Sequence, residues 1–373
     1  MAEAIRIKLD DPGITSEDER AVLEVLRSGQ IVAGPRVREL ERALAVRTGR
    51  ARAVAVSSGT VALYAAMEAL GIGPGSTVVV PALTFPAPAV VASYLGARVT
   101  TCDVDAETLN ISPATLAPLL HERISLVVAI DQFGNPAPVP ELEELLRPLR
   151  VPVLVDGACS LGSSLGGRPC GGFGEAAIFS FHPRKVITTG EGGLVLTDDS
   201  RIADRARTLR NVGMDRGTFR ALGLNLRPSE LGAALGLSQL QRLDRTLERR
   251  RRMARRYRER LGALRFQKTL GGAEHNVQTM VAVLPEEFEE SARDELIDAA
   301  REAGIEIGIA SYSIGELGWL AERLEVDGDA LPGARAAHRR GIALPLHAAI
   351  GEAEVEEVCD FVREWLDSRG GKA

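Results

Sequence analysis

Short apolar segments alternate with amphipathic segments along the first two-thirds of the chain. The apolar segments have the length of buried strands, and most of the segments between them carry apolar residues at helical spacing. Strands that alternate with helices in this way form βαβ crossovers, so the pattern predicts an α/β fold with a mostly parallel sheet flanked by helices. The predicted strands are 51–56, 77–80, 98–104, 125–130, 151–155, 176–181 and 194–196.

Helices are expected between these strands and on both sides of them. A capping pattern at Thr15-Ser16-Glu17-Asp18 predicts a helix that continues to about Ser28. A long amphipathic helix is predicted to begin at Ser229-Glu230 and to continue to Arg260. The other predicted helices are 37–47, 61–70, 87–94, 113–120, 139–149 and 202–209.

The pattern changes after about residue 260. A predicted strand at 279–284 precedes a helix at 290–303 and a candidate strand at 305–309, and a short apolar run at 342–346 precedes a final helix at 353–365. These elements predict a smaller α+β domain at the C-terminus. We therefore expect a large domain over 1–245, with N-terminal helices, and a small domain over 246–373.

Composition excludes several classes of function. The 373 residues are 45% hydrophobic and carry a net charge of −6, so we expect neither nucleic acid nor a membrane as a partner. Four prolines interrupt the uncharged stretch 69–97, which therefore predicts strand, loop and helix rather than a membrane span. The arginine run 249–252 is interpreted as a solvated helix face because glutamates lie nearby.

The cysteines and the N-terminus indicate a cytoplasmic protein. Cys102, Cys159, Cys170 and Cys359 are far apart in the sequence and have no metal-binding spacing, which favours reduced thiols. The first residues lack the apolar core of a signal peptide.

The strongest candidate for chemistry is Lys185, which lies in a loop between the apolar runs 176–181 and 194–196. An amine held on a tight loop between buried segments can be desolvated, and a neutral amine attacks carbonyl groups to form a Schiff base. The alternative is an ordinary solvated surface lysine, which is far more common.

Three further features lie near predicted strand ends. The turn Ser57-Ser58-Gly59-Thr60 leads from a strand into a helix and suits an anion, although it also fits an ordinary helix cap. Phe85 follows a strand where ligands bind in open α/β sheets, but it also fits a core aromatic. Asp156 ends a buried strand, where a carboxylate needs a cation or hydrogen-bond donors, and the alternative is a turn or cap aspartate.

Taken together, these segments resemble the DegT/StrS-type sugar aminotransferases, pyridoxal-phosphate (PLP) enzymes with the aspartate aminotransferase fold, which is PLP fold type I. The resemblance covers most of the chain. The segments that carry it are Phe179–Lys185, Gly190–Gly193, Ser57–Thr60, Gly172–Ala177, Arg210–Met214, Ala233–Asp244 and Ala343–Pro345.

The resemblance implies specific roles. Lys185 is the Schiff-base lysine and the base that moves the substrate proton, and Asp156 pairs with the pyridine nitrogen of PLP. Phe85 stacks on the cofactor ring, and Asn225 reaches the phosphate of the neighbouring subunit's cofactor, which implies a homodimer with shared active sites. The residues placed around the cofactor phosphate are Ser58, Gly59, Thr60 and Ser180.

The chain departs from the family pattern near the substrate. Cys159 stands where the family usually has Gln or His beside the phenolic oxygen of PLP, and a thiol is a weaker hydrogen-bond partner. Asp131-Gln132-Phe133-Gly134 stands where many relatives carry His-Leu-Tyr-Gly, and Ile309–Ile314 lies in the region of a family substrate loop that contains His and Tyr.

The resemblance therefore predicts a PLP-dependent aminotransferase. We expect it to move an amino group, with glutamate as the expected donor, onto a keto or aldehyde carbon of a sugar, nucleoside or cyclitol. The alternatives are a PLP-dependent dehydratase, in which the lysine is typically replaced by His, and a non-catalytic regulatory protein on the same fold.

Overall fold

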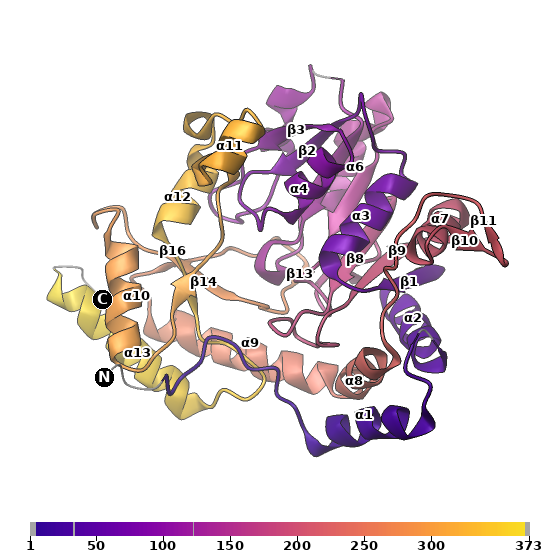
Figure 1. The fold of residues 1–373 in the computed structure, drawn as a ribbon. Coiled ribbons are helices and arrows are strands. Elements are labelled where there is room, and N and C mark those ends of the chain that lie inside the picture. Colours follow the sequence, from indigo (N-terminus) through magenta and orange to yellow (C-terminus); the bar gives the residue numbers. More distant parts are fainter. Residues whose placement is uncertain (1–4, 33, 122, 370–373) are drawn as a thin grey trace.

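The computed structural model describes residues 5–32, 34–121 and 123–369. Its centre is a seven-stranded sheet with the strand order β1-β9-β8-β5-β4-β2-β3 (Figure 1). The pairs from β8 to β3 are parallel, whereas β9 is antiparallel to both of its neighbours. The strands are β1 (Arg52–Val56), β2 (Thr77–Pro81), β3 (Arg98–Cys102), β4 (Leu126–Ile130), β5 (Val153–Asp156), β8 (Ala176–Ser180) and β9 (Gly193–Thr197). The predicted mostly parallel sheet is confirmed, and each strand predicted for this sheet lies within two residues of its observed bounds.

Helices cover both faces of this sheet because its strands are buried on both sides. Alternate residues of a strand point to opposite faces, so Val54 and Val56 of β1 join one core while Ala53 and Ala55 join the other. Helices α3 (Gly59–Ala69), α4 (Ala87–Tyr94) and α7 (Ser200–Arg210) close the first face. Helices α2 (Pro35–Thr48), α5 (Pro113–Leu116), α6 (Val139–Leu146) and α8 (Glu230–Gln241) close the second.

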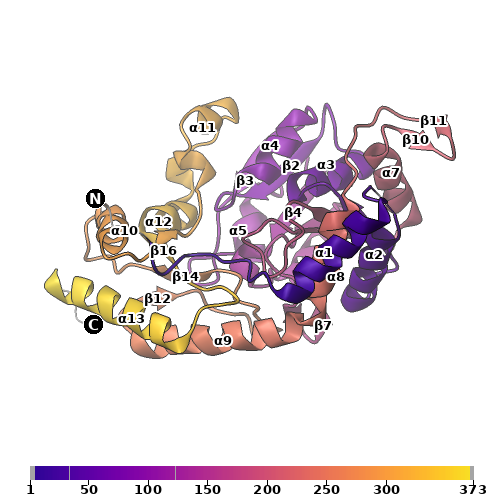
Figure 2. The same ribbon diagram turned by 60° about the horizontal axis from the view of Figure 1, so that its bottom comes forward.

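The long C-terminal helix of the large domain is not continuous, contrary to the prediction. Helix α8 ends at Gln241 and α9 (Leu243–Arg260) begins after Arg242, whose φ of −108° departs from helical geometry. Figure 2 shows α1 (Ser16–Ser28) lying along α8, and α9 continuing to pack against α13 (Glu352–Ser368). The proposed domain boundary at residue 245 falls in α9, whose residues contribute to both the large-domain core and the C-terminal core.

The C-terminal domain is built on a four-stranded antiparallel sheet. Its order is β12-β14-β16-β15, with strands β12 (Arg265–Phe266), β14 (Met280–Val283), β15 (Gly308–Ile309) and β16 (Gly341–Leu344). The pattern alone does not classify the apolar run at 342–346. Its first three residues belong to β16, an inner strand of this sheet. Helices α10 (Ala292–Glu302), α11 (Trp319–Arg323), α12 (Pro332–Arg340) and α13 complete this domain.

The remaining elements are short. Strands β6 (Ser164–Leu165), β7 (Arg168–Pro169) and β13 (Ala273–Glu274) form a small sheet, and β10 (Met214–Asp215) with β11 (Thr218–Phe219) forms a hairpin beside α7. Five 3₁₀ turns are present among the described residues: 117–119, 132–134, 147–149, 314–316 and 328–330.

No helix in the described ranges has the length and apolar character needed to cross a bilayer.

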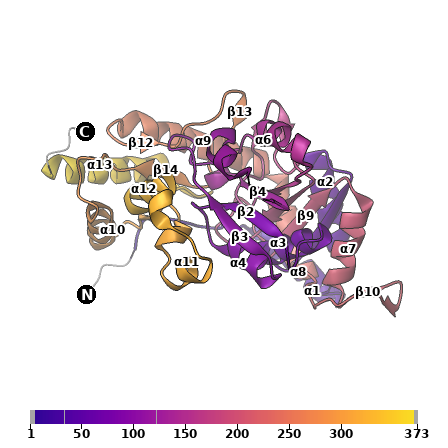
Figure 3. The ribbon, with the colours of Figure 1, turned by 90° about the horizontal axis from the view of Figure 1, so that it is seen from above.

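Segments of the C-terminal domain pack directly against the large domain. Figure 3 shows α11 and α12 beside the β2–β3 side of the large sheet. Thr84 N donates to Tyr312 O at 2.8 Å and Ile314 N donates to Ala82 O at 2.8 Å, so the loop after β2 is bridged to residues 312–314. This contact brings a C-terminal loop to the carboxyl edge of the large sheet.

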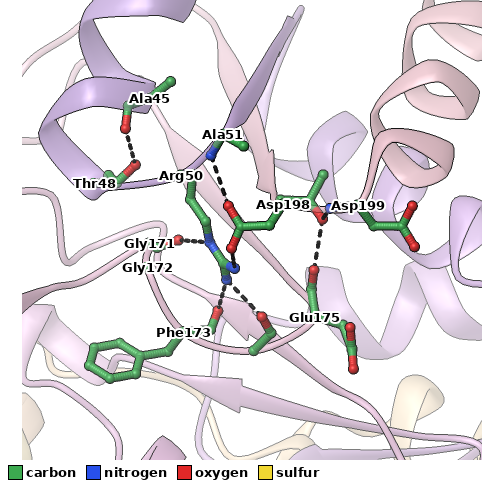
Figure 4. A network of polar contacts seen from close by, with 12 residues as sticks. Ala45, Thr48, Arg50, Ala51, Gly171, Gly172, Phe173, Glu175, Asp198 and Asp199 are labelled. Atoms are coloured by element: carbon green, nitrogen blue, oxygen red, sulfur yellow. Dashed lines mark hydrogen bonds and ion pairs between the residues drawn. The ribbon is translucent and has the colours of Figure 1, made fainter.

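A buried arginine fixes the loop that leads into β8. Arg50, which is 7% exposed, donates from Nε to Gly171 O at 2.9 Å and from Nη2 to the carbonyls of Phe173 and Gly174 (Figure 4). Its Nη1 lies 2.8 Å from a carboxylate oxygen of Asp198. Arg50 follows α2 and Asp198 follows β9, so one side chain joins three segments that are far apart in the sequence.

Candidate active site

The carboxyl ends of the parallel strands bring the predicted site residues to one edge of the sheet. In the order β8-β5-β4-β2, the residues at this edge are Ser180, Asp156, Asp131 and the loop that contains Phe85. Open α/β sheets bind ligands at this edge because the strand ends leave room between the crossover loops.

Lys185 lies in the loop between β8 and β9 and is half-buried. Its amine contacts the thiol of Cys159, with 3.1 Å between Nζ and Sγ. Cys159 follows β5 by three residues, so the amine points back toward the strand that ends in Asp156. The lysine is therefore directed into the protein and does not resemble a freely solvated surface side chain.

Side chains from three other regions hold the lysine loop in place. Gln239 Oε1 of α8 accepts a hydrogen bond from Thr188 N at 2.8 Å. Gln278 of the C-terminal domain donates to the carbonyl of Arg184, and the Arg184 guanidinium forms a 2.9 Å ion pair with Asp10. The position of Lys185 thus depends on packing between the two domains.

Asp156 is a buried carboxylate at the end of β5, with an exposed fraction of 6%. Ala158 N donates to its Oδ1 at 3.0 Å. Burial raises the pKa of Asp156, and the hydrogen bond from Ala158 and the positive charge of Lys185 lower it in part. A protonated ring nitrogen is the type of partner that such a carboxylate requires.

A second buried carboxylate, Asp131, lies at the end of the neighbouring strand β4. It accepts hydrogen bonds from Ser160 Oγ at 2.5 Å and from Ala137 N at 2.9 Å. Burial raises the pKa of Asp131 to about 6, and the charge of Asp156 adds to the increase. The adjacent Gln132 is also buried, and its amide donates to the carbonyl of Leu83, two residues before Phe85.

The turn before α3 has the geometry of an anion site. Ser58 caps the helix, with Val61 N donating to Ser58 Oγ at 3.2 Å. The backbone at Gly59 passes so close to Ser180 that a Cβ at position 59 would lie 2.7 Å from the Ser180 Cβ. Thr60 is exposed at the first turn. The N-terminus of α3 thus lies against the Ser180 side chain at the edge where β8 ends, an arrangement suited to a phosphate group.

Phe85 is 67% exposed and is not a core residue. Its ring lies edge-on to Tyr312 of the C-terminal domain, with 6.5 Å between the ring centroids. Tyr312 in turn lies 6.4 Å from the ring of His338 on α12. These rings form an aromatic surface where the two domains meet.

Asn225 is exposed in the segment between the β10–β11 hairpin and α8. It pairs with Asn211 in an isolated bridge, and the carbonyl of the next residue, Leu226, accepts from Ser57 N at 3.0 Å. Among the described residues, no hydrogen bond joins its side chain to the other predicted site residues. Its exposure leaves it available to a neighbouring molecule.

Residues 12–363 match the DegT/DnrJ/EryC1/StrS aminotransferase family. The chain belongs to this family. Among curated relatives, GDP-perosamine synthase of Caulobacter vibrioides is 33% identical over 365 residues, which cover 96% of this chain and 98% of the relative.

Solved structures of family proteins have the same fold. The aminotransferase TlmJ of Streptoalloteichus hindustanus is 31% identical with a TM-score of 0.91, covering 98% of this chain and all of its own. A putative sugar aminotransferase, Spr1654 of Streptococcus pneumoniae, is 25% identical in its PMP form with a TM-score of 0.93, covering 97% of this chain and 98% of its own. The same protein has also been solved in a PLP form.

These matches confirm the predicted family, its aminotransferase class, the fold type I architecture and, for the family, PLP as cofactor. The side chains of this DegT-family chain fit that cofactor chemically. The Lys185 amine, the buried Asp156 carboxylate and the helix-start turn at Gly59 lie along one edge of the sheet. These groups suit the aldehyde, the ring nitrogen and the phosphate of PLP, respectively.

Sequence reasoning missed residues from the C-terminal domain that support the site. Asn276 donates from Nδ2 to the carbonyls of Cys159 at 2.8 Å and Leu161 at 2.9 Å, and Gln278 holds the lysine loop. Both lie just before β14 and are buried. Polar residues in alternation before an apolar strand are the only signal the sequence offers, and it does not identify their partners.

Proposed function

We propose that this DegT-family enzyme transfers an amino group from glutamate to a carbonyl carbon of a sugar. The sugar acceptor is in keeping with relatives such as GDP-perosamine synthase. The observation that supports this most directly is the Lys185 amine, directed at Cys159 beside the buried Asp156. PLP, when bound, supplies the aldehyde that accepts the amino group and a ring that withdraws electrons from the reacting carbon.

Each predicted residue receives a role in this proposal. Lys185 binds the cofactor aldehyde and then carries the proton at its Nζ. Asp156 keeps a proton on the ring nitrogen, because a buried carboxylate without a cation is unfavourable. Phe85 covers the ring face, and Cys159 lies near the phenolic oxygen. The residues proposed to bind the phosphate are Ser58, Gly59, Thr60 and Ser180.

We further propose that the enzyme is a homodimer in which Asn225 reaches the partner's cofactor phosphate. The exposure of Asn225 and the apolar residues that follow the β10–β11 hairpin support this arrangement. We also propose a cytoplasmic location, for which the support is that all four cysteines are free thiols.

Absorption spectroscopy with matched lysine variants tests this proposal. Protein purified with PLP should show the visible band of lysine-bound cofactor, and Lys185→Ala should lose it. The exposed Lys268, which pairs with Glu107, provides a control in Lys268→Ala, which should keep the band.

The reaction itself is tested with ¹⁵N-glutamate and nucleotide-linked keto sugars. Transfer of the label into the sugar product supports amino transfer. A colourless protein that binds no PLP would contradict the proposal, as would a product from which a hydroxyl is lost without any incorporation of label.

A further inference from the structure

Helix α9 carries eight arginines between residues 249 and 260. Six of them have partners: Arg249, Arg250 and Arg251 donate to backbone carbonyls, and Arg252, Arg256 and Arg260 pair with acidic side chains of α13. Within the part of the chain that the structure describes, Arg255 and Arg258 have neither an ion pair nor a hydrogen bond. Arg255 is exposed to solvent, whereas Arg258 is half-buried, so the arginine run is not uniformly solvated and Arg258 lacks both a partner and full solvation.

Both unpaired arginines line one cavity. Positions 251, 255 and 258 fall on one face of α9 because residues four and three apart are neighbours on a helix. The cavity has a volume of about 280 Å³. The residues that line it are Arg251, Arg255, Arg258, Thr269, Glu274, His275 and Val277. It is thus bordered by three guanidinium groups and one carboxylate.

Arg258 is partly buried without a counter-charge. Burial lowers the pKa of Arg258, and no acidic side chain offsets this effect. The carboxylate in the cavity lining, Glu274, is largely exposed and pairs with Arg251 at 3.4 Å. A guanidinium stays charged at neutral pH, so a partly buried one without an anion is unfavourable.

His275 provides a second, independent feature of this cavity. It is 8% exposed, and its Nε2 lies 3.1 Å from the carbonyl of Phe133, so Nε2 carries the hydrogen. Nδ1 is then a hydrogen-bond acceptor, and it is buried with no partner among the described residues. The pKa of His275 is lowered to about 4, first by burial and then by repulsion from Arg258 and Arg251, so the ring is neutral at pH 7.

We propose that this cavity binds a small phosphorylated anion of the diphosphate class. Phosphate oxygens accept charge-assisted hydrogen bonds from arginine forks, and the guanidinium groups of Arg255 and Arg258 at this cavity have no other partner among the described residues. The volume lies just below the usual range of about 300 to 1,000 Å³ for ligand pockets, which favours a diphosphate group over a whole nucleotide sugar. The site is separate from the Lys185 region and does not depend on the proposed amino transfer.

Calorimetric titration of the PLP-loaded enzyme tests the proposal, because the cofactor phosphate then fills the turn before α3. Inorganic diphosphate should bind saturably and more tightly than inorganic phosphate. Arg258→Met should weaken diphosphate binding by about tenfold to a hundredfold, since charge-assisted hydrogen bonds contribute about 1.5–3 kcal/mol. Arg245→Ala removes an exposed arginine of the same helix outside the cavity and should leave the affinity unchanged.

Thermal unfolding provides a second measurement, because it compares the stability of the folded protein with and without the anion. Arg258→Met removes an unpaired, partly buried charge, so without anion it should unfold at the wild-type temperature or higher. At one diphosphate concentration, the unfolding temperature should rise for wild type and Arg245→Ala, and by less for Arg258→Met. The proposal is overturned if diphosphate shows no saturable binding, or if Arg258→Met binds it as tightly as wild type.

Discussion

At the scale of single residues, two buried carboxylates at neighbouring strand ends have different surroundings. Asp156 lies beside the charge of Lys185, whereas Asp131 is held by a hydroxyl and a backbone amide and gains no cation among the described residues. Because the lysine charge favours ionisation only at Asp156, that group is suited to hold a cation, and Asp131 is suited to bind a proton near neutral pH.

We expect Asp131 to make the stability of the protein depend on pH. Its pKa is about 6 in the folded protein against 3.8 as the ordinary value, so folding favours the protonated form. The stability it contributes is present below about pH 3.8 and is lost as pH rises to about 6, by roughly 3 kcal/mol in total.

Asp131→Asn should remove this dependence while keeping two hydrogen bonds. Urea unfolding of wild type and variant at several pH values between 4 and 7 measures the effect. The free energy of unfolding of wild type should fall relative to that of the variant as pH rises. Parallel curves across this range would show that Asp131 does not titrate there.

At the scale of elements, short polar contacts decide where each segment ends. Strand β8 is positioned by Arg50, which joins the segment after α2 to the loop 171–174 and to Asp198. The amphipathic pattern predicts one helix from 230 to 260. The helix breaks at Arg242, although no proline lies there. At this position the Arg242 guanidinium pairs with Asp18 of α1, a tertiary contact that periodicity does not encode.

We expect Arg50→Met to destabilise the protein by about 3–5 kcal/mol. The change leaves the carbonyls of Gly171, Phe173 and Gly174 without their donor in a buried region. Denaturant unfolding measures the loss. Arg201→Ala, which removes an exposed arginine that pairs with Asp199, serves as control and should unfold like wild type. An Arg50→Met protein as stable as wild type would show that water replaces the lost donor.

At the scale of the whole molecule, the exposed apolar residues support the proposed dimer. The hairpin and the segment after it expose Phe219 and Leu222, the latter at 94%, close to the exposed Asn225. Apolar side chains on a projecting hairpin favour contact with a second copy, because burying them removes apolar surface from water.

We expect Leu222→Glu to weaken the dimer about tenfold or more, because it places a charge in an apolar contact. Analytical ultracentrifugation over a dilution series measures the dissociation constant. Leu149→Glu, at a half-exposed leucine that follows α6, should leave it unchanged. A protein that sediments as a monomer at all concentrations before any substitution would contradict the proposed shared active site.

Local pattern determined most of the large sheet. Strand-length apolar runs with helices between them favour a mostly parallel sheet covered on both faces, so the positions of the seven strands follow from the sequence. The antiparallel pairing of β9 does not. The segments Phe179–Lys185 and Ser57–Thr60 also identified the family and the candidate lysine, because their residue types are tied to one cofactor chemistry.

Tertiary structure alone decided the contacts that join segments far apart in the chain. The Lys185–Cys159 contact and the arginine cavity on α9 depend on how separate elements pack within a domain. The support from Asn276 and Gln278 and the ring of Phe85 beside Tyr312 depend on how the two domains pack. Such contacts leave no periodicity in the sequence, because each involves only one or two residues whose partners lie on other elements.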